Sequence, residues 1–217
     1  MKTDLKKQLA SYTAPHDDFQ LTSVPPLQYL MIDGHGDPNT SPAYAAALAA
    51  LFSVAYKLKF LSRRELDRDY TVMPLEALWW ADDMESFTTA RDKSHWDWTV
   101  MSLVPDWITL DHLAEVRDAI VRAGGASAIE HLRLETLDEG DVVQTLHIGS
   151  YDDEGPVLQR MHDEFIPAHA LTRVGKHHEI YLNDFRRTPP EKLRTILRQP
   201  VATASDRDEP LSRAGGS

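Results

Sequence analysis

The stretch "HHEIYLND", residues 177–184, has the alternation of a β-strand with a carboxylate near its centre. Side chains alternate between the two faces of a strand, so Ile180 is expected on one face, and Glu179 and Tyr181 on the other. A carboxylate among aromatic groups loses solvation, which raises its pKa and suits it to act as a general base or to pair with a ligand cation. The alternative is a half-exposed strand glutamate in a surface ion pair. The neighbouring hydroxyl of Tyr181, which can donate or accept a hydrogen bond, favours the functional interpretation.

The composition is that of a globular domain. The chain has 217 residues, enough to bury a substantial core, with 42% hydrophobic and 26% charged residues. Its formal net charge of -11 disfavours direct binding of nucleic acid. There is no cysteine, which excludes disulfides, thiol catalysis and thiolate metal sites. The sequence shows no signal peptide and no long apolar run, so we expect no membrane association and a cytoplasmic location.

Strand and helix signals alternate along the chain. A strand is expected from residue 27 to about 33, ended by glycines. The next helix should begin with Ser41 as N-cap and Pro42 at its first position, and continue to about residue 61. The remaining expected elements are strands within 69–83 and 93–106, a helix at 109–125, two strands in 128–151 joined as a hairpin at "DEG", a helix at 152–171 with Val157, Met161 and Phe165 as its apolar stripe, and a helical turn within 188–201.

This order predicts a duplicated α+β fold. Each half contains a strand, a glycine turn, a helix and a strand with a central glutamate, which is Glu76 in the first half and Glu179 in the second. We expect the two halves to pair their sheets and to leave a concave ligand groove between them. Glu76 and Glu179 would then occupy corresponding places in that groove.

Tryptophans surround the first of these glutamates. In "MPLEALWW" (73–80), alternation places Trp80 on the same face as Glu76, and in "HWDWTVM" (95–101) Trp96 and Trp98 share a face. Aromatic rings stack on flat ligands and offer a large contact area. We therefore expect these tryptophans to contact ligand, although each of them could equally be a core residue.

The remaining side chains near the glycine turns indicate ligand contacts more than metal binding. His147 and Tyr151 flank the second turn and are candidate ligand-binding residues. His177 and His178 are adjacent and would face opposite sides of a strand, so they cannot bind one metal together. No zinc-protease, phosphate-loop or serine-nucleophile signature is present, and we expect neither metal nor cofactor.

Several of these segments, taken together, resemble the GyrI-like small-molecule-binding family. They are "MPLEALWW", "HWDWTVMSLVPD", "EGDVVQTLHIGSYDDEGPVLQRMHDEFI" and "HHEIYLNDFRRTPPEKLRTILRQPV". The resemblance covers roughly residues 20 to 201 and is most specific from Glu139 to Val201. It implies duplicated strand-helix-strand-strand halves with pseudo-twofold symmetry. The domain would span 21–201, with halves at about 21–108 and 126–201, after an N-terminal extension (1–20) and before a disordered tail (202–217).

The resemblance also implies chemistry. In multidrug-responsive regulators of this family, a buried glutamate in an E-x-Y strand contacts aromatic cationic drugs, and Glu179 with Tyr181 matches that motif. Some stand-alone relatives hydrolyse the strained cyclopropane of DNA-alkylating natural products in a groove lined by tryptophan and glutamate. The residues here that suit such a groove are Glu76, Trp80, Trp98, Glu179 and Tyr181.

Three functions follow from these observations. The first is a hydrolase that detoxifies strained alkylating compounds and so confers resistance, with Glu179, Glu76 and Tyr181 as catalytic residues. The second is a non-catalytic protein that senses or sequesters flat hydrophobic ligands, whose protein partner, if any, is unknown. The third is a gyrase-inhibitor-like module whose acidic surface imitates DNA. Hydrolysis is favoured over passive binding by a small margin.

Overall fold

The computed structural model describes residues 2–81, 93–125 and 127–203. Two successive sets of strands and helices form the fold, linked by α4 (Leu110–Arg122). The first set comprises β2 (Gln20–Val24), β3 (Leu27–His35), α2 (Pro42–Glu65), β4 (Asp69–Tyr70), β5 (Leu75–Trp80) and β6 (Asp97–Leu103). The second comprises β7 (Arg133–Leu137), β8 (Gly140–Ile148), α5 (Gly155–Gln159), the π-helix η5 (Arg160–Phe165), α6 (Ile166–Ala168), β9 (Leu171–Arg173), β10 (His177–Tyr181) and β11 (Arg194–Thr203). The short N-terminal elements are β1 (Lys2–Thr3), α1 (Leu5–Gln8) and η1 (Ala10–Tyr12).

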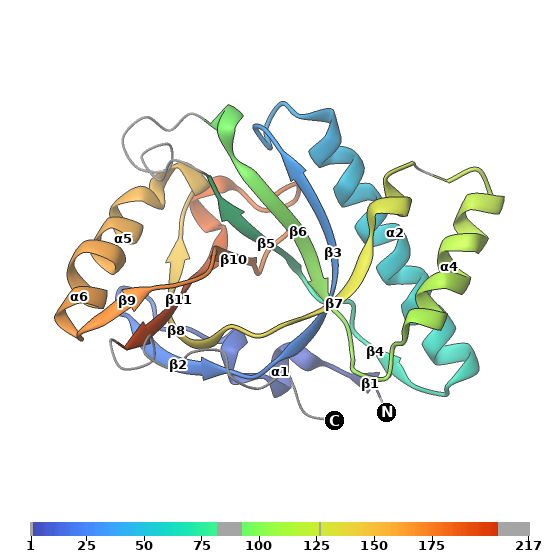
Figure 1. Cartoon of the computed structure of the whole chain (residues 1–217), viewed down its shortest axis with the longest axis horizontal. Helices are drawn as coiled ribbons and strands as arrows, with labels where there is room; N and C mark the ends of the chain where they lie inside the picture. The colour runs from blue at the N-terminus through green and yellow to red at the C-terminus, as the bar shows by residue number, and fades with distance from the viewer. Residues whose placement is uncertain (1, 82–92, 126, 204–217) are drawn as a thin grey trace, which may run out of the picture.

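Nine strands form one sheet in the order β2-β8-β11-β10-β5-β6-β3-β7, with β9 paired to β11. The antiparallel pair β5–β10 lies at its centre and joins the two halves. Helices α2 and α5–α6 lie on either side of these central strands (Figure 1). The predicted α+β fold is confirmed, whereas the half boundaries and the ligand groove stay predictions. The predicted tail begins with the end of β11, and its residues 204–217 lie outside the described residues.

The predicted hairpin at "DEG" is wrong. Strand β7 pairs with β3 and strand β8 pairs with β2, and the register continues from Val24 opposite Gly140 to Leu27 opposite Leu137. The two chain segments therefore form one long ribbon, which is continuous in Figure 1. The two prolines between Val24 and Leu27 have no N–H for the ladder, so the ribbon is interrupted there. Gly140, with φ of 60°, bends the opposite segment.

Helix α2 begins where the sequence predicts. The Ser41 side chain accepts a hydrogen bond from the Tyr44 backbone N–H at 3.4 Å, and Pro42 occupies the first turn. Alanine-rich sequence favours the helix, which extends to Glu65. Among the described residues, α2 is the one helix long and apolar enough to cross a membrane, and its buried face packs on the sheet.

Two segments of the second half differ from their predicted form. The helix expected at 152–171 is divided into α5, η5 and α6, and the π-helical turns bury Met161 while Val157 and Phe165 are partly buried. The helical turn expected within 188–201 is only the short 3₁₀ turn η6 (Pro190–Lys192), and β11 follows it. This last strand lies between β10 and β8, so pairing on both sides determines its extended form.

The sheet has a core on each face. On one face, α2 and the α5–α6 segment cover Ala77, Trp79 and Leu197. On the other, Leu78 and Ile180 pack with the N-terminal residue Tyr12. The alternation of β5 and β10 therefore assigns each side chain to one of two separate environments.

Candidate functional site

Glu179 lies at the centre of the sheet, on the face covered by the helices. It is paired with Ala77 of β5 and Leu197 of β11, so its side chain shares a face with Trp79. The side chain of Glu179 is 13% exposed. A carboxylate in this position is accessible from one side while the sheet fixes its backbone.

A chain of hydrogen bonds orients this carboxylate. The Trp79 Nε1–H donates to the Tyr181 hydroxyl at 3.1 Å, and that hydroxyl donates to Oε2 of Glu179 at 2.5 Å. Burial and the charge of Glu179 raise the pKa of Tyr181 well above its usual value. Tyr181 therefore keeps its proton and stays a donor to the carboxylate at neutral pH.

Aromatic rings surround the Glu179–Tyr181 pair. The ring of Tyr151 packs edge-on against Tyr181 at 5.4 Å, and Tyr44 from α2 stacks on Trp79 at 6.2 Å. Trp96 lies edge-on to Trp79 at 5.6 Å. The pKa values of Tyr44 and Tyr151 are both raised, mainly by burial and in part by the charge of Glu179. We call Glu179, Tyr181, Trp79 and these three rings the aromatic carboxylate site.

Trp98 lies beside this site, on the neighbouring strand β6 and directly opposite Trp79. It is 1% exposed, its Nε1–H donates to the Gly36 carbonyl at 3.2 Å, and its ring contacts Tyr44 edge-on at 5.0 Å. A Cβ added to Gly34 would lie 2.1 Å from the Trp98 ring, so the glycine makes room for it. The structure thus brings the predicted residues Tyr151, Trp96, Glu179 and Tyr181 together, with Trp98 beside Trp79 as a core residue.

His177 adjoins the carboxylate of Glu179, and His162 in turn adjoins His177. Nε2 of His177 lies 3.4 Å from Oε1 of Glu179. The ring of His162, from the π-helix, is centred 6.3 Å from the His177 ring. Glu179 thus has a hydroxyl donor at one oxygen and an imidazole near the other.

Glu76 is not part of this arrangement. It pairs with Ile180, so it faces the opposite side of the sheet, where it is fully buried. From the sequence, Glu76 and Glu179 are expected at corresponding places, but in the paired strands Glu179 lies opposite Ala77, one residue away from Glu76. A shift by one residue places a side chain on the other face of the sheet. The position that faces the helices beside Glu179 is Ala77.

Glu76 instead belongs to a buried ionic network. His178 bridges two carboxylates, with Nε2 3.0 Å from Glu76 Oε2 and Nδ1 2.9 Å from Glu139 Oε1. Arg198 donates to Glu139 Oε2 at 2.7 Å and to the Ser11 carbonyl at 2.6 Å. The Tyr12 hydroxyl donates to Glu76 Oε1 at 2.5 Å.

The charges in this network stabilise one another. Burial opposes ionisation of Glu139, but His178 and Arg198 outweigh it and lower its pKa to about 2. Burial likewise opposes the charge on His178, but the carboxylates of Glu139 and Glu76 raise its pKa. A doubly bridged imidazole with both nitrogens facing carboxylates is best satisfied as the cation.

Trp80 shares the face of Glu76 and not that of Glu179. It packs against the core of that face, and the Lys176 ammonium lies 3.2 Å from its ring centroid. Burial lowers the pKa of Lys176. Trp80 is therefore separated by the sheet from the aromatic carboxylate site.

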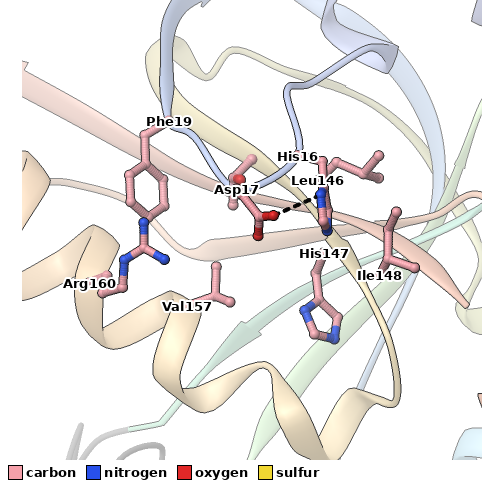
Figure 2. A pocket seen from close by; sticks show the side chains of 9 residues that line it. His16, Asp17, Phe19, Leu146, His147, Ile148, Val157 and Arg160 are labelled. Carbon is pink, nitrogen blue, oxygen red and sulfur yellow. Dashed lines mark ion pairs between the residues drawn. The ribbon is translucent and has the colours of Figure 1, made fainter. Parts of the chain in front are cut away.

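His147 lines a cavity that does not include Glu179. It pairs with Thr195 of β11, on the face of Glu179 but two strands away from β10. A cavity of about 200 Å³ lies beside it, with Phe19, Val157 and Arg160 around it (Figure 2). His147 itself contacts the Ser150 carbonyl at 3.0 Å. The predicted contact between His147 and the ligand of Glu179 thus stays a prediction, and the structure does not bring the two residues together.

Sequence reasoning missed several residues of the two arrangements. Tyr44 and Trp79 belong to the aromatic carboxylate site, and Trp79 was detectable because alternation separates it from Glu76. Arg198 and Glu139, the partners in the ionic network, were harder to detect from the sequence. Their only signal is a charged residue within an apolar strand, for Arg198, or next to one, for Glu139. In the part of the chain that the structure describes, no group of three or more histidine, aspartate or glutamate side chains has the geometry to hold a metal ion.

Comparisons with known proteins place this chain in a family. A family model described as GyrI-like small molecule binding domain matches residues 17–202. An uncharacterized conserved protein from Listeria innocua is 32% identical, with a TM-score of 0.83 over 92% of this chain and 100% of that chain. A Listeria innocua structure described as a hydrolase is also 32% identical, with a TM-score of 0.82 over 93% of this chain and 100% of its own.

A more distant likeness concerns the fold alone. The C-terminal domain of EcmrR is 9% identical, with a TM-score of 0.53 over 86% of this chain and 98% of that chain. No curated protein matches the chain. The family match over most of the chain and the two Listeria innocua structures agree, and the chain belongs to the GyrI-like small molecule binding domain family.

Proposed function

We propose that the protein hydrolyses flat, strained cyclopropane compounds, with Glu179 as the general base. The observation on which this rests is the orientation of Glu179, whose Oε2 accepts from Tyr181 while the carboxylate stays partly accessible among aromatic rings. Tyr44, Trp96 and Tyr151 are partly exposed and offer ring faces and edges to a planar molecule. A ligand held there would have its reactive carbon close to an oriented carboxylate.

The chemical step requires no cofactor. Glu179 takes a proton from a water molecule while the water oxygen forms a bond to a cyclopropane carbon. The C–C bond of the ring breaks, and its electron pair moves into a conjugated carbonyl, whose oxygen becomes an anion. That oxygen takes up a proton from solvent as Glu179 releases the one it accepted, which restores the carboxylate. The net change is addition of one water, and release of ring strain supplies driving force.

Two further observations support this proposal. One Listeria innocua relative is described as a hydrolase, and this chain is 32% identical to it. That description is consistent with hydrolysis by this chain. The position of Glu179 in an E-x-Y strand also matches the family motif. The biological role would be protection against alkylating compounds in the cytoplasm.

A passive ligand-binding protein is the second candidate. Glu179 already has a donor at Oε2 and an imidazole near Oε1, an arrangement that would equally serve recognition of a cationic ligand. The assignment of Glu76 as a second base, by contrast, has no geometric support, because Glu76 is enclosed in the ionic network. The gyrase-inhibitor alternative rests on net charge alone.

The test is turnover with substoichiometric protein. The protein would be incubated with an excess of a compound in which a cyclopropane is conjugated to a carbonyl, and the products would be analysed by mass spectrometry. Many equivalents of a water-added product, absent with Glu179→Gln, would support the hydrolase. Unaltered compound, with tryptophan fluorescence quenched on titration, would instead identify a binding protein.

A further inference from the structure

The cavity beside His147 is separate from the aromatic carboxylate site. It measures about 200 Å³ and lies between β8, the α5–η5 segment and the loop of residues 16–19 (Figure 2). None of the described residues that line it belongs to the aromatic carboxylate site. A cavity of about 150 Å³ is enough to hold benzene in a protein interior, so this one has room for a small ring with one substituent.

One part of the cavity is apolar. Phe19, Val157 and Leu146 line it, together with Ile148, which is 43% exposed. The ring of Phe19 is itself supported by that of Phe165, at 5.2 Å between centroids. Such walls favour a ligand with an apolar body over a wholly polar solute.

Arg160 brings a positive charge to the same cavity. Its guanidinium carbon lies over the Phe19 ring, 5.4 Å from the centroid, and this contact holds the cation without giving any of its five N–H donors an oxygen acceptor. Among residues 2–81, 93–125 and 127–203, Arg160 makes no hydrogen bond and no ion pair. The side chain is therefore positioned by the aromatic ring while its donors stay available to a ligand.

His147 provides a fixed wall. Its Nε2 lies 3.0 Å from the Ser150 carbonyl, which can only accept, so this nitrogen carries the hydrogen. Gly149, with φ of 148°, leaves room for the contact, because a Cβ there would lie 3.1 Å from the same nitrogen. A wall that is already immobile loses little entropy when a ligand binds.

The charges around the cavity fit a monoanion. A guanidinium can donate two parallel hydrogen bonds to one carboxylate. The carboxylate of Asp17 also borders the cavity, where it pairs with His16 at 3.0 Å and its side chain is 80% exposed. A second negative charge on the ligand would be opposed by Asp17, whereas a single one is balanced by Arg160.

We infer that this cavity is a second binding site, for a small aromatic or aliphatic carboxylic acid bound as its anion. The carboxylate accepts from Arg160, and the apolar body lies against Phe19 and Val157. This ligand differs in charge and in size from the flat compound proposed for Glu179, whose own carboxylate disfavours an anion. The inference goes beyond the proposed function and does not depend on it.

Benzoate and benzamide are matched probes, because they share size and shape and differ in charge. In ¹H–¹⁵N NMR titrations, benzoate should bind saturably with a Kd of about 1 mM or below. Its largest shifts should lie at the amides of Phe19 and His147, and not at Tyr181. Benzamide and acetate should each bind about tenfold or more weakly, since one lacks the charge and the other the ring.

Arg160→Gln tests the assigned partner of the carboxylate. The variant should weaken benzoate binding about tenfold and remove the preference over benzamide. The matched control is Arg122→Gln, an exposed arginine in the last turn of α4, which should keep benzoate affinity within about twofold. Unchanged affinity in Arg160→Gln, or an equal loss in both variants, would overturn the inference.

The titration of the unmodified protein decides the inference even if Arg160→Gln fails to fold. Absence of saturation, or benzoate shifts centred on Tyr181, would overturn the site. Tighter binding of phenyl phosphate than of benzoate would overturn the assignment to a monoanion. None of these measurements involves turnover, so they are independent of the test of the hydrolase.

Discussion

His178 and Glu179 are neighbours in the chain, yet their side chains belong to arrangements on opposite faces of one sheet. His178 bridges the carboxylates of Glu76 and Glu139 inside the protein. Glu179 accepts from Tyr181 on the face covered by the helices. Substitutions at adjacent positions of β10 should therefore have different consequences, one for stability and the other for activity.

Glu179→Gln should abolish catalysis without unfolding the protein. Glutamine keeps the volume and can accept from Tyr181, but it cannot take a proton from water. We expect the rate of cyclopropane opening to fall by about 10²- to 10⁴-fold, measured by mass spectrometry. The exposed residue Glu191 offers the control Glu191→Gln, which should leave the rate unchanged. Full activity in Glu179→Gln would show that another group is the base.

Tyr181→Phe tests whether orientation of the carboxylate matters. The change removes the hydroxyl that donates to Glu179 and accepts from Trp79. A hydrogen bond to a charged group contributes about 1.5–3 kcal/mol, so we expect kcat to fall about 10- to 100-fold with a smaller change in KM. Steady-state kinetics would decide, and an unchanged kcat would reduce Tyr181 to a packing residue.

Arg198→Met should strongly destabilise the protein. The substitution leaves Glu139 buried without its guanidinium partner, and breaking a buried pair on one side typically costs about 3–5 kcal/mol. Urea denaturation would measure the free energy of unfolding. Arg194→Met, on the same strand but exposed, should cost less than about 0.5 kcal/mol. Similar stability of the two variants would contradict a structural role for the network.

The network should also make stability depend on pH in two directions. The pKa of His178 is raised, so its contribution is present below the unfolded pKa of about 6.5 and is lost as the pH rises through the folded pKa. The pKa of Glu139 is lowered to about 2, so its contribution is present above the unfolded pKa and is lost as the pH falls towards 2. Unfolding free energies between pH 3 and 9 should show both losses. The alkaline loss should disappear in His178→Gln, and its persistence would exclude His178 as the cause.

Trp96 and Trp98 should respond differently to truncation. Trp98→Ala removes a buried ring that Gly34 and Tyr44 contact, and should cost about 3–5 kcal/mol of stability. Trp96 is only partly buried, so Trp96→Ala should mainly weaken binding of planar ligands. Fluorescence titration and thermal unfolding of both variants would separate these effects, and unchanged affinity in Trp96→Ala would remove Trp96 from the ligand site.

Local sequence signals were sufficient for much of this architecture. The alternation of β5 and β10 assigned Glu76 and Trp80 to one face of their strand, and Glu179 and Tyr181 to one face of theirs, as the structure has them. The cap at Ser41 and the alanine-rich run located α2. These features depend on neighbouring residues, and periodicity detects them directly.

Features that depend on distant parts of the chain were not detected. The alignment of the two halves was wrong by an odd number of residues because no local signal determines register across β5 and β10. The contacts of Arg198 with Ser11 and Glu139 join residues that are far apart in sequence. The helical turn predicted at the end of the chain was replaced by β11 because pairing with both neighbours outweighed local propensity.

The long ribbon formed by β2–β3 and β7–β8 has a consequence for folding. Each half of the molecule completes its sheet with a strand from the other, and pairs such as Gln20 with Gln144 join positions roughly 120 residues apart. The entropy of closing such a long loop must be offset before these contacts contribute, so the ribbon should form late and folding should be slow. Separately expressed halves would each have an unpaired strand edge, and they would reach the native state only by associating with each other.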